Sequence, residues 1–217
     1  VPESAAVVVE RGAEANLDWE PLREMVAACT RCTLHETRTQ TVFGVGSRSA
    51  RWMFIGEAPG AEEDRQGEPF VGRAGQLLTS MLKALGFSRE DVYIANVLKC
   101  RPPGNRDPLP DEIATCTPFL AEQVHLISPS VIATLGNFAT RYMLGTDRPI
   151  SALRGRLFRV DGRRIVPVFH PAAALYDRTK QQVLLEDFHR IRAVLEQDEA
   201  DGVGPASAGD GTQQQLF

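Results

Sequence analysis

The sequence predicts an α/β protein, a three-layer α/β/α sandwich around a central, largely parallel, four-stranded sheet. Short apolar runs of four to six residues alternate with longer segments in which apolar residues recur at three- and four-residue spacing. This alternation of strands and helices is typical of a parallel sheet that carries helices on both faces. A length of 217 residues suits one domain of this kind.

Each element follows from a local pattern. Strands are expected at 51–55, 92–97, 131–135 and 164–169, and a strand at 157–160 pairs with the last of these through an Asp161-Gly162 turn. Helices are expected at 18–28, 74–85, 110–126, 137–144 and 179–196. Gly86 stops the second helix, and Pro110 suits the first turn of the third. The segment 56–72 is rich in Gly and Pro and is expected to be a loop.

Three segments divide the chain. Residues 1–16 show no sustained period and are expected to be a flexible arm, and 17–196 are expected to form the domain. The composition of 197–217 does not support a core, so we expect a disordered tail. We find no apolar run long enough to span a bilayer and no secretory signal, and we expect a cytoplasmic protein that acts as a monomer.

The charge of the chain is unevenly spread. The net charge of −4 at first argues against a nucleic-acid partner, but five acidic residues follow Arg192, the last basic one. Residues 17–195 carry 23 basic and 20 acidic residues. Composition therefore permits a local basic patch for nucleic acid, although not a strong field over the whole surface.

Polar side chains that could take part in catalysis follow the expected carboxyl ends of the strands, where open parallel sheets bind their ligands. Gly56-Glu57, Asn96, Gly136 and His170 stand at these four ends. Each has a simpler explanation, since Asn96 could end a strand and His170 could start a helix. Their convergence nevertheless predicts an active site at this edge of the sheet.

The chain has four cysteines, and their spacing predicts a metal site. Cys29 and Cys32 form a C-x-x-C pair, and Cys100 and Cys116 could complete a tetrahedral set. The alternative is four buried thiols, while disulfides are disfavoured in a reducing compartment. Spacing alone accepts either zinc or an iron–sulfur cluster.

Several motifs together resemble the family 4 uracil-DNA glycosylases, the iron–sulfur members of the uracil-DNA glycosylase superfamily. The resemblance covers roughly residues 22–195. The motifs, in order, are Gly56-Glu57-Ala58-Pro59-Gly60 with Glu63-Asp64, then Pro69-Phe70-Val71-Gly72, Asn96 before Cys100-Arg101-Pro102-Pro103, and His170-Pro171-Ala172-Ala173. The resemblance implies excision of uracil from single- or double-stranded DNA, and a [4Fe–4S] cluster on Cys29, Cys32, Cys100 and Cys116.

The chemistry of uracil excision suits these residues. Phe70 offers a face on which the flipped base can stack. The amide of Asn96 can donate to uracil O4 and accept from N3–H, a polarity that cytosine inverts. His170 can donate to O2 as negative charge grows on the leaving base.

The position of the attacking water is less defined by the sequence. Backbone groups of Gly56, Glu57 and Ala58 are expected to complete the pocket. Better-known members of the superfamily carry an aspartate where this chain has Ala58, so Glu57 is the nearest carboxylate that could orient water. Exclusion of thymine is unassigned, with Glu62 or Glu63 as candidates.

The segment after His170 is expected to contact DNA. By resemblance it inserts into the duplex, with Leu175 as the wedge and Arg178 near a phosphate. An ordinary core leucine at the start of a helix is an equally good interpretation of Leu175. A different alternative for the whole chain is a non-catalytic nucleic-acid-binding module with a structural zinc. An α/β hydrolase is disfavoured because the sequence lacks a Gly-x-Ser-x-Gly motif.

The chain ends in Gln213-Gln214-Gln215-Leu216-Phe217, after a stretch with the composition of a flexible linker. The pattern Gln-x-x-Leu-Phe resembles the peptide by which bacterial repair proteins dock on the sliding clamp. Gln213, Leu216 and Phe217 are therefore expected to form a partner motif, with an unselected polar tail as the alternative.

Overall fold

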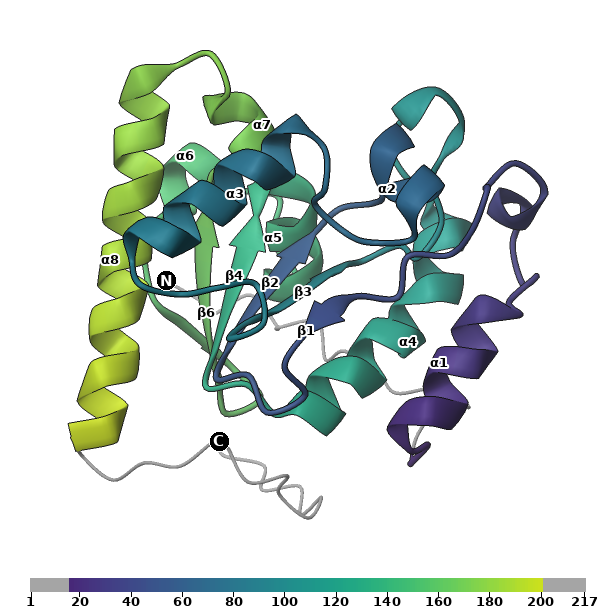
Figure 1. Ribbon diagram of the computed structural model, residues 1–217, viewed down its shortest axis with the longest axis horizontal. Helices are drawn as coiled ribbons and strands as arrows, with labels where there is room; N and C mark the ends of the chain where they lie inside the picture. Colours follow the sequence, from purple (N-terminus) through teal and green to yellow (C-terminus); the bar gives the residue numbers. More distant parts are fainter. Residues whose placement is uncertain (1–15, 201–217) are drawn as a thin grey trace.

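The computed structural model describes residues 16–200 and has a single mixed sheet of six strands in the order β1-β3-β2-β4-β6-β5 (Figure 1). The strands are β1 (Val45–Gly46), β2 (Trp52–Gly56), β3 (Tyr93–Asn96), β4 (Val131–Leu135), β5 (Phe158–Val160) and β6 (Arg163–Val168). The middle four strands, β3-β2-β4-β6, pair in parallel, and β1 and β5 add antiparallel edges. The predicted fold class is confirmed, and the sheet adds two edge strands to the expected four: β5, which matches the expected hairpin strand at 157–160, and β1, which was not expected.

The helices lie close to their predicted positions. The longer helices are α1 (Trp19–Ala27), α3 (Arg73–Ala84), α4 (Pro110–Ile127), α5 (Gly136–Leu144) and α8 (Arg178–Ala200). The shorter ones are α2 (Ala61–Gln66), α6 (Ile150–Leu153), α7 (Pro171–Ala174) and two 3₁₀ turns at Thr33–Glu36 and Pro103–Asn105. The expected loop at 56–72 therefore contains a helix, and α8 continues four residues beyond the expected end at 196.

Alternation along the buried strands produces the three layers. In β2, Trp52 and Phe54 pack against α3 and α8, whereas Met53 and Ile55 face α4 and α5. Every residue of β2 is buried, as expected for a central parallel strand covered on both faces.

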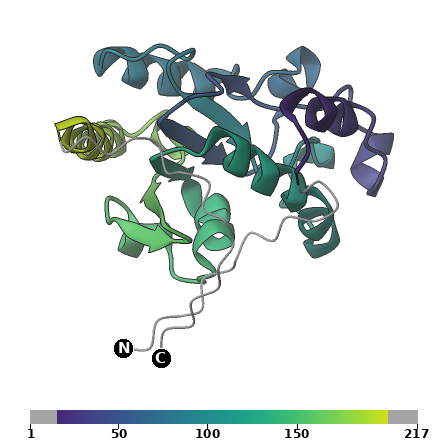
Figure 2. The same cartoon turned by 90° about the horizontal axis from the view of Figure 1, so that it is seen from below.

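A third apolar cluster packs α1 against the start of α4 and includes all four cysteines. Figure 2 shows α1 beside α4 at one end of the molecule, with α8 at the opposite end. No helix of the described residues is long and apolar enough to cross a membrane. Residues 1–15 and 201–217, with Gln213, Leu216 and Phe217, lie outside the described part of the chain.

Candidate active site

A pocket of about 410 Å³ opens at the carboxyl ends of the parallel strands. These ends point towards α2 and α7, at the top of Figure 1. Five of the six residues predicted to bind the base line the pocket, namely Glu57, Ala58, Phe70, Asn96 and His170. Three residues that the strand-end rule selected, Glu57, Asn96 and His170, thus come together around one pocket.

Gly56, the sixth of these residues, lies beneath the pocket floor and makes room for its neighbours. Gly56 and Asn96 are register partners in the parallel pair β2–β3. A Cβ atom on Gly56 would lie 2.4 Å from Asn96 Oδ1 and 2.6 Å from Phe70 Cζ. Only glycine therefore allows Asn96 and Phe70 to approach one another over the end of β2.

Asn96 carries an unused acceptor. Its side chain is 2% exposed, and within the described residues Oδ1 has no hydrogen-bond partner. An unpaired buried acceptor costs about 1–3 kcal/mol, and a ligand that donated a hydrogen bond to this atom would remove that cost. The backbone beside it is fixed, because Val97 N donates to Gly56 O at 2.9 Å.

His170 follows β6 and forms the N-cap of α7. Its Nδ1 accepts a hydrogen bond from the backbone N–H of Ala172 at 3.1 Å. Desolvation in the pocket lowers the pKa of His170 to about 4, against the opposing effect of the Glu63 carboxylate. The imidazole is therefore neutral at physiological pH, and with Nδ1 as an acceptor its proton lies on Nε2.

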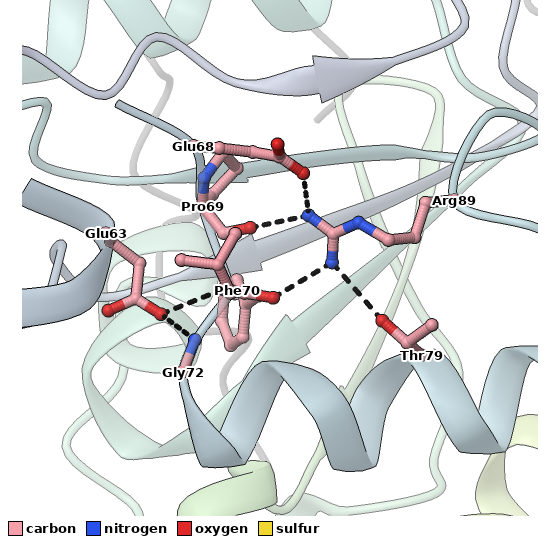
Figure 3. Close-up of polar contacts among 8 residues, drawn as sticks. Glu63, Glu68, Pro69, Phe70, Gly72, Thr79 and Arg89 are labelled. Carbon is pink, nitrogen blue, oxygen red and sulfur yellow. Dashed lines mark hydrogen bonds and ion pairs between the residues drawn. The ribbon is translucent and has the colours of Figure 1, made fainter. Parts of the chain in front are cut away.

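Phe70 forms one wall of the pocket with its ring 5.7 Å from that of His170, at an interplanar angle of 34°. Its backbone has φ +54°, a left-handed conformation that non-glycine residues rarely adopt. Strain of this type costs on the order of 1–3 kcal/mol and needs support from surrounding contacts. Here the contacts come from two charged side chains (Figure 3), those of Glu63 and Arg89.

Glu57 and Glu63 are the carboxylates of the pocket. Desolvation raises the pKa of Glu57 above its ordinary value, and the charge of Asp107 raises it further. Glu63 Oε1 accepts from the backbone N–H groups of Val71 at 3.0 Å and Gly72 at 2.9 Å. Its Oε2 lies 2.7 Å from the position of a Cβ on Gly60, so this carboxylate fills the space that a larger residue at Gly60 would occupy.

Sequence analysis missed two pocket residues in the proline loop. Asn105 and Arg106 line the same pocket as His170. Arg101 Nε donates to Asn105 Oδ1 at 2.7 Å, and Arg106 binds Glu112 through both guanidinium Nη atoms at 2.9 and 2.6 Å. The sequence indicated only that these residues belong to a proline-rich loop. It could not show that the loop reaches the pocket, because that depends on long-range packing.

The segment after His170 is mostly helical. Within it, Leu175 is half-buried between α7 and α8, and Arg178 is exposed at the first position of α8. Tyr176, which sequence analysis did not select, is 78% exposed. The guanidinium of Arg73, at the start of α3, lies over the Tyr176 ring at 5.0 Å.

The four cysteines line one small cavity beside α1. Cys29 and Cys32 lie between α1 and the first 3₁₀ turn, Cys100 follows β3, and Cys116 belongs to α4. Arg38 Nη1 donates to Cys100 Sγ at 3.0 Å, and the backbone N–H of Lys99 donates to Cys116 Sγ at 3.2 Å. Such N–H donors suit thiolate sulfur.

Burial opposes ionisation of the free thiols. It raises the pKa of Cys116 to about 12 and also raises the pKa values of Cys32 and Cys100. Thiolates here therefore require nearby positive charge, which metal ions supply. The donor set fits a thiolate-bound metal group, although no three His, Cys, Asp or Glu side chains of residues 16–200 are arranged to hold a metal ion.

Lys99 lies between the two sites and is 1% exposed. Its Nζ donates to Asn96 O at 2.9 Å and to Gln123 Oε1 at 2.6 Å. Desolvation lowers the pKa of Lys99 to about 8, while Cys116 and Cys100 oppose this shift. The same short segment thus carries Asn96 into the pocket and Cys100 into the cysteine cavity.

Comparisons with known proteins agree with the geometry. Residues 43–193 match the family described as the uracil DNA glycosylase superfamily. The chain is 45% identical to the type-4 uracil-DNA glycosylase of Archaeoglobus fulgidus, over 76% of this chain and 87% of that protein. The type-4 enzymes of Sulfurisphaera tokodaii and Thermotoga maritima are 46% and 43% identical, covering 80% and 82% of this chain and 83% and 95% of theirs. The chain therefore belongs to the uracil-DNA glycosylase superfamily and, within it, to the type-4 uracil-DNA glycosylases.

Proposed function

We propose that the chain excises uracil from DNA by hydrolysing the N-glycosidic bond, and so initiates repair of deaminated cytosine. The observation that carries the proposal is the buried, unpaired Oδ1 of Asn96, beside a neutral His170 whose free N–H is on Nε2. Relatives whose names state this activity, at 43–46% identity over most of the chain, support it. A cytoplasmic location, as expected from the sequence, fits an enzyme of DNA repair.

Asn96 distinguishes uracil from cytosine. Its Oδ1 accepts from uracil N3–H, and its amide N–H donates to uracil O4. Cytosine has an acceptor at N3 and an amino donor at C4, so both contacts would be repulsive. The Phe70 ring stacks on the base, a contact worth about 1–3 kcal/mol.

His170 stabilises the leaving base. As the C1′–N1 bond breaks, electron density moves onto uracil, and the Nε2 proton of neutral His170 donates to O2. The Ala172 N–H on Nδ1 prevents the other tautomer and aims the donor. Loss of such a donor typically costs about 10²–10³ in rate.

Glu57 is proposed to orient the attacking water by accepting a hydrogen bond from it. It is a half-buried carboxylate of the pocket, and the adjacent Ala58 has no polar side chain. The side-chain amide of Asn105 lines the same pocket and is a second group within the site that could orient water. Glu63 fills the space next to Gly60, which favours it over Glu62 for the exclusion of thymine.

The cysteine cavity is proposed to hold a [4Fe–4S] cluster on Cys29, Cys32, Cys100 and Cys116. The four thiols share one cavity, and N–H groups donate to two of the sulfurs. When bound, the cluster supplies iron–thiolate bonds that brace the fold. These four residues tie the segment after α1 to the exit of β3 and to α4.

DNA is proposed to contact the segment between α7 and α8. Leu175 is the candidate wedge and Arg178 the candidate phosphate contact, and exposed Tyr176 with Arg73 adds an aromatic surface near the pocket. The tail motif Gln213, Leu216 and Phe217 is proposed to bind a bacterial sliding clamp, with the enzyme acting as a monomer. Equal clamp binding by the whole chain and by a chain lacking 213–217 would exclude the clamp proposal.

Excision is tested with a labelled oligonucleotide that contains one uracil, incubated with the protein and then treated with alkali. We expect cleavage at the uracil and none at a cytosine or thymine in the same position. An intact strand after stoichiometric incubation would refute the proposal and favour the alternative of a non-catalytic nucleic-acid-binding module.

A further inference from the structure

Arg89 lies outside every motif of the pocket, on the turn between α3 and β3. Its guanidinium is 15% exposed and donates to four oxygens (Figure 3). Two of these are the consecutive carbonyls of Pro69 at 2.6 Å and Phe70 at 3.0 Å. The others belong to Glu68, at 2.8 Å, and Thr79, at 3.4 Å.

The opposite side of the same turn is held by Glu63. Its Oε1 accepts from the next two backbone N–H groups, those of Val71 and Gly72. A cation therefore binds the carbonyls on one side of Phe70, and a carboxylate binds the N–H groups on the other. Both contacts favour the same orientation of the peptide dipoles, because each charge faces the complementary end of the peptide group.

This pair of contacts acts on a strained residue. Phe70 has φ +54°, and its carbonyl is enclosed by α3, since a Cβ on Gly75 would lie 1.8 Å from Phe70 O. Without Arg89, the carbonyls of two buried residues would lose a charged donor, while the left-handed backbone of Phe70 would still be strained. The turn would then relax, and the ring of Phe70 would leave its position beside His170.

We propose that Arg89 is a positioning residue for base recognition, acting on the flipped base only through the backbone of Phe70. The inference rests on the proposed function, because the ring must stack on a base for its position to matter. Arg89 reaches this turn from a distant part of the chain, and its planar guanidinium donates to both carbonyls while pairing with Glu68.

The test compares Arg89→Met with wild type in single-turnover excision and in inhibition by free uracil. We expect the inhibition constant of uracil to rise about tenfold and the excision rate to fall by a similar factor, as expected for partial loss of stacking. Arg89→Lys keeps the charge and should recover part of both losses. Thr79→Val, which removes only the longest of the four contacts, should change neither quantity by more than about twofold.

A double-mutant cycle separates positioning from general stability. In a Phe70→Ala background there is no ring to position, so Arg89→Met should change excision by less than about twofold. An equal loss in both backgrounds, or wild-type rate and uracil inhibition in Arg89→Met, would overturn the proposal. If Arg89→Met does not fold, the same cycle with Arg89→Lys decides the question. A wild-type protein without excision activity would instead refute the proposed function, which makes the two failures distinguishable.

Discussion

The pocket at the end of the sheet and the cysteine cavity beside α1 both contain groups that could bind a further partner, but the groups are of different kinds. In the pocket the unsatisfied group is a neutral acceptor, Asn96 Oδ1, held on a rigid strand end. In the cavity the groups are thiols, of which Cys100 and Cys116 are buried and Cys32 is half-buried, and burial raises the pKa values of these three. The first can wait unpaired between substrates, whereas thiolates in the second need permanent positive charge. The pocket therefore suits a neutral ligand that donates a hydrogen bond, whereas the cysteine cavity suits a positively charged metal group.

The strongest test of the pocket is Asn96→Asp. An ionised carboxylate repels uracil O4 and cannot donate to it, so we expect uracil excision to fall by about 10³-fold or more. When protonated, the same side chain suits cytosine better, and weak cytosine excision is the expected gain. Single-turnover rates on matched uracil and cytosine oligonucleotides measure both, and full uracil activity in this variant would show that Asn96 does not recognise the base.

His170→Ala should lower the single-turnover rate by about 10²–10³-fold while DNA affinity changes little. The reason is that its Nε2 donor is most important when charge has developed on uracil. The variant should keep any cluster bound at the cysteines, because His170 lies in the other site. A rate near that of wild type would remove His170 from the mechanism.

Cys100→Ala addresses the other site. We expect loss of iron and of the brown colour, with the unfolding temperature lowered by roughly 10 °C. The excision rate per folded molecule should stay within about tenfold of wild type if the proposed cluster only stabilises the fold. Iron analysis, visible absorption and thermal unfolding measure these effects. A Cys100→Ala protein with full iron content would contradict ligation by four cysteines.

The pH dependence should report Glu57 and not His170. Desolvation and Asp107 raise the pKa of Glu57, so the carboxylate is lost as the pH falls through a value above 4.5, and excision should fall with it. His170, with a pKa of about 4, adds no inflection near its ordinary value of 6.5. Glu57→Gln should be slower and should lose the inflection that Glu57 causes, so that only a change near the pKa of His170, about 4, remains. An unchanged limb in Glu57→Gln would assign it to another group.

The smallest effect is expected at the segment between α7 and α8, which is proposed to contact DNA. Tyr176→Ala should weaken binding of a uracil-containing duplex by about fivefold, as for loss of one stacking contact. Leu175→Ala is the comparison, because Leu175 is the half-buried neighbour. Fluorescence anisotropy on the same duplex ranks the two, and the larger loss identifies the wedge.

The spacing of apolar residues was enough to predict the elements that are long or buried on both faces. The parallel strands and the long helices have strong periodicity, and the strand-end rule located Asn96 and His170. The sequence did not reveal β1, because a two-residue strand depends on its pairing with β3. It also did not reveal α2, where glycine and acidic residues conceal any apolar period.

The support of the site was the least predictable part. Arg89 is 19 residues from Phe70, and Asn105 is nine residues beyond Asn96 on a loop without periodicity. Their approach to the pocket depends on how the sheet and helices pack. The residues proposed to contact the base were recognised by their chemistry, whereas the residues that hold those side chains were found only in the three-dimensional structure.

The buried Lys99 also has a consequence for the way this chain can change in length. Its ammonium group is bound by Asn96 O, and its backbone N–H by Cys116, so the backbone from 96 to 100 is fixed at both ends. One inserted residue would turn either Asn96 away from the pocket or Cys100 away from the cysteine cavity. We therefore expect evolution to place insertions and deletions elsewhere, and the number of residues in this segment to be inherited as strictly as their identity.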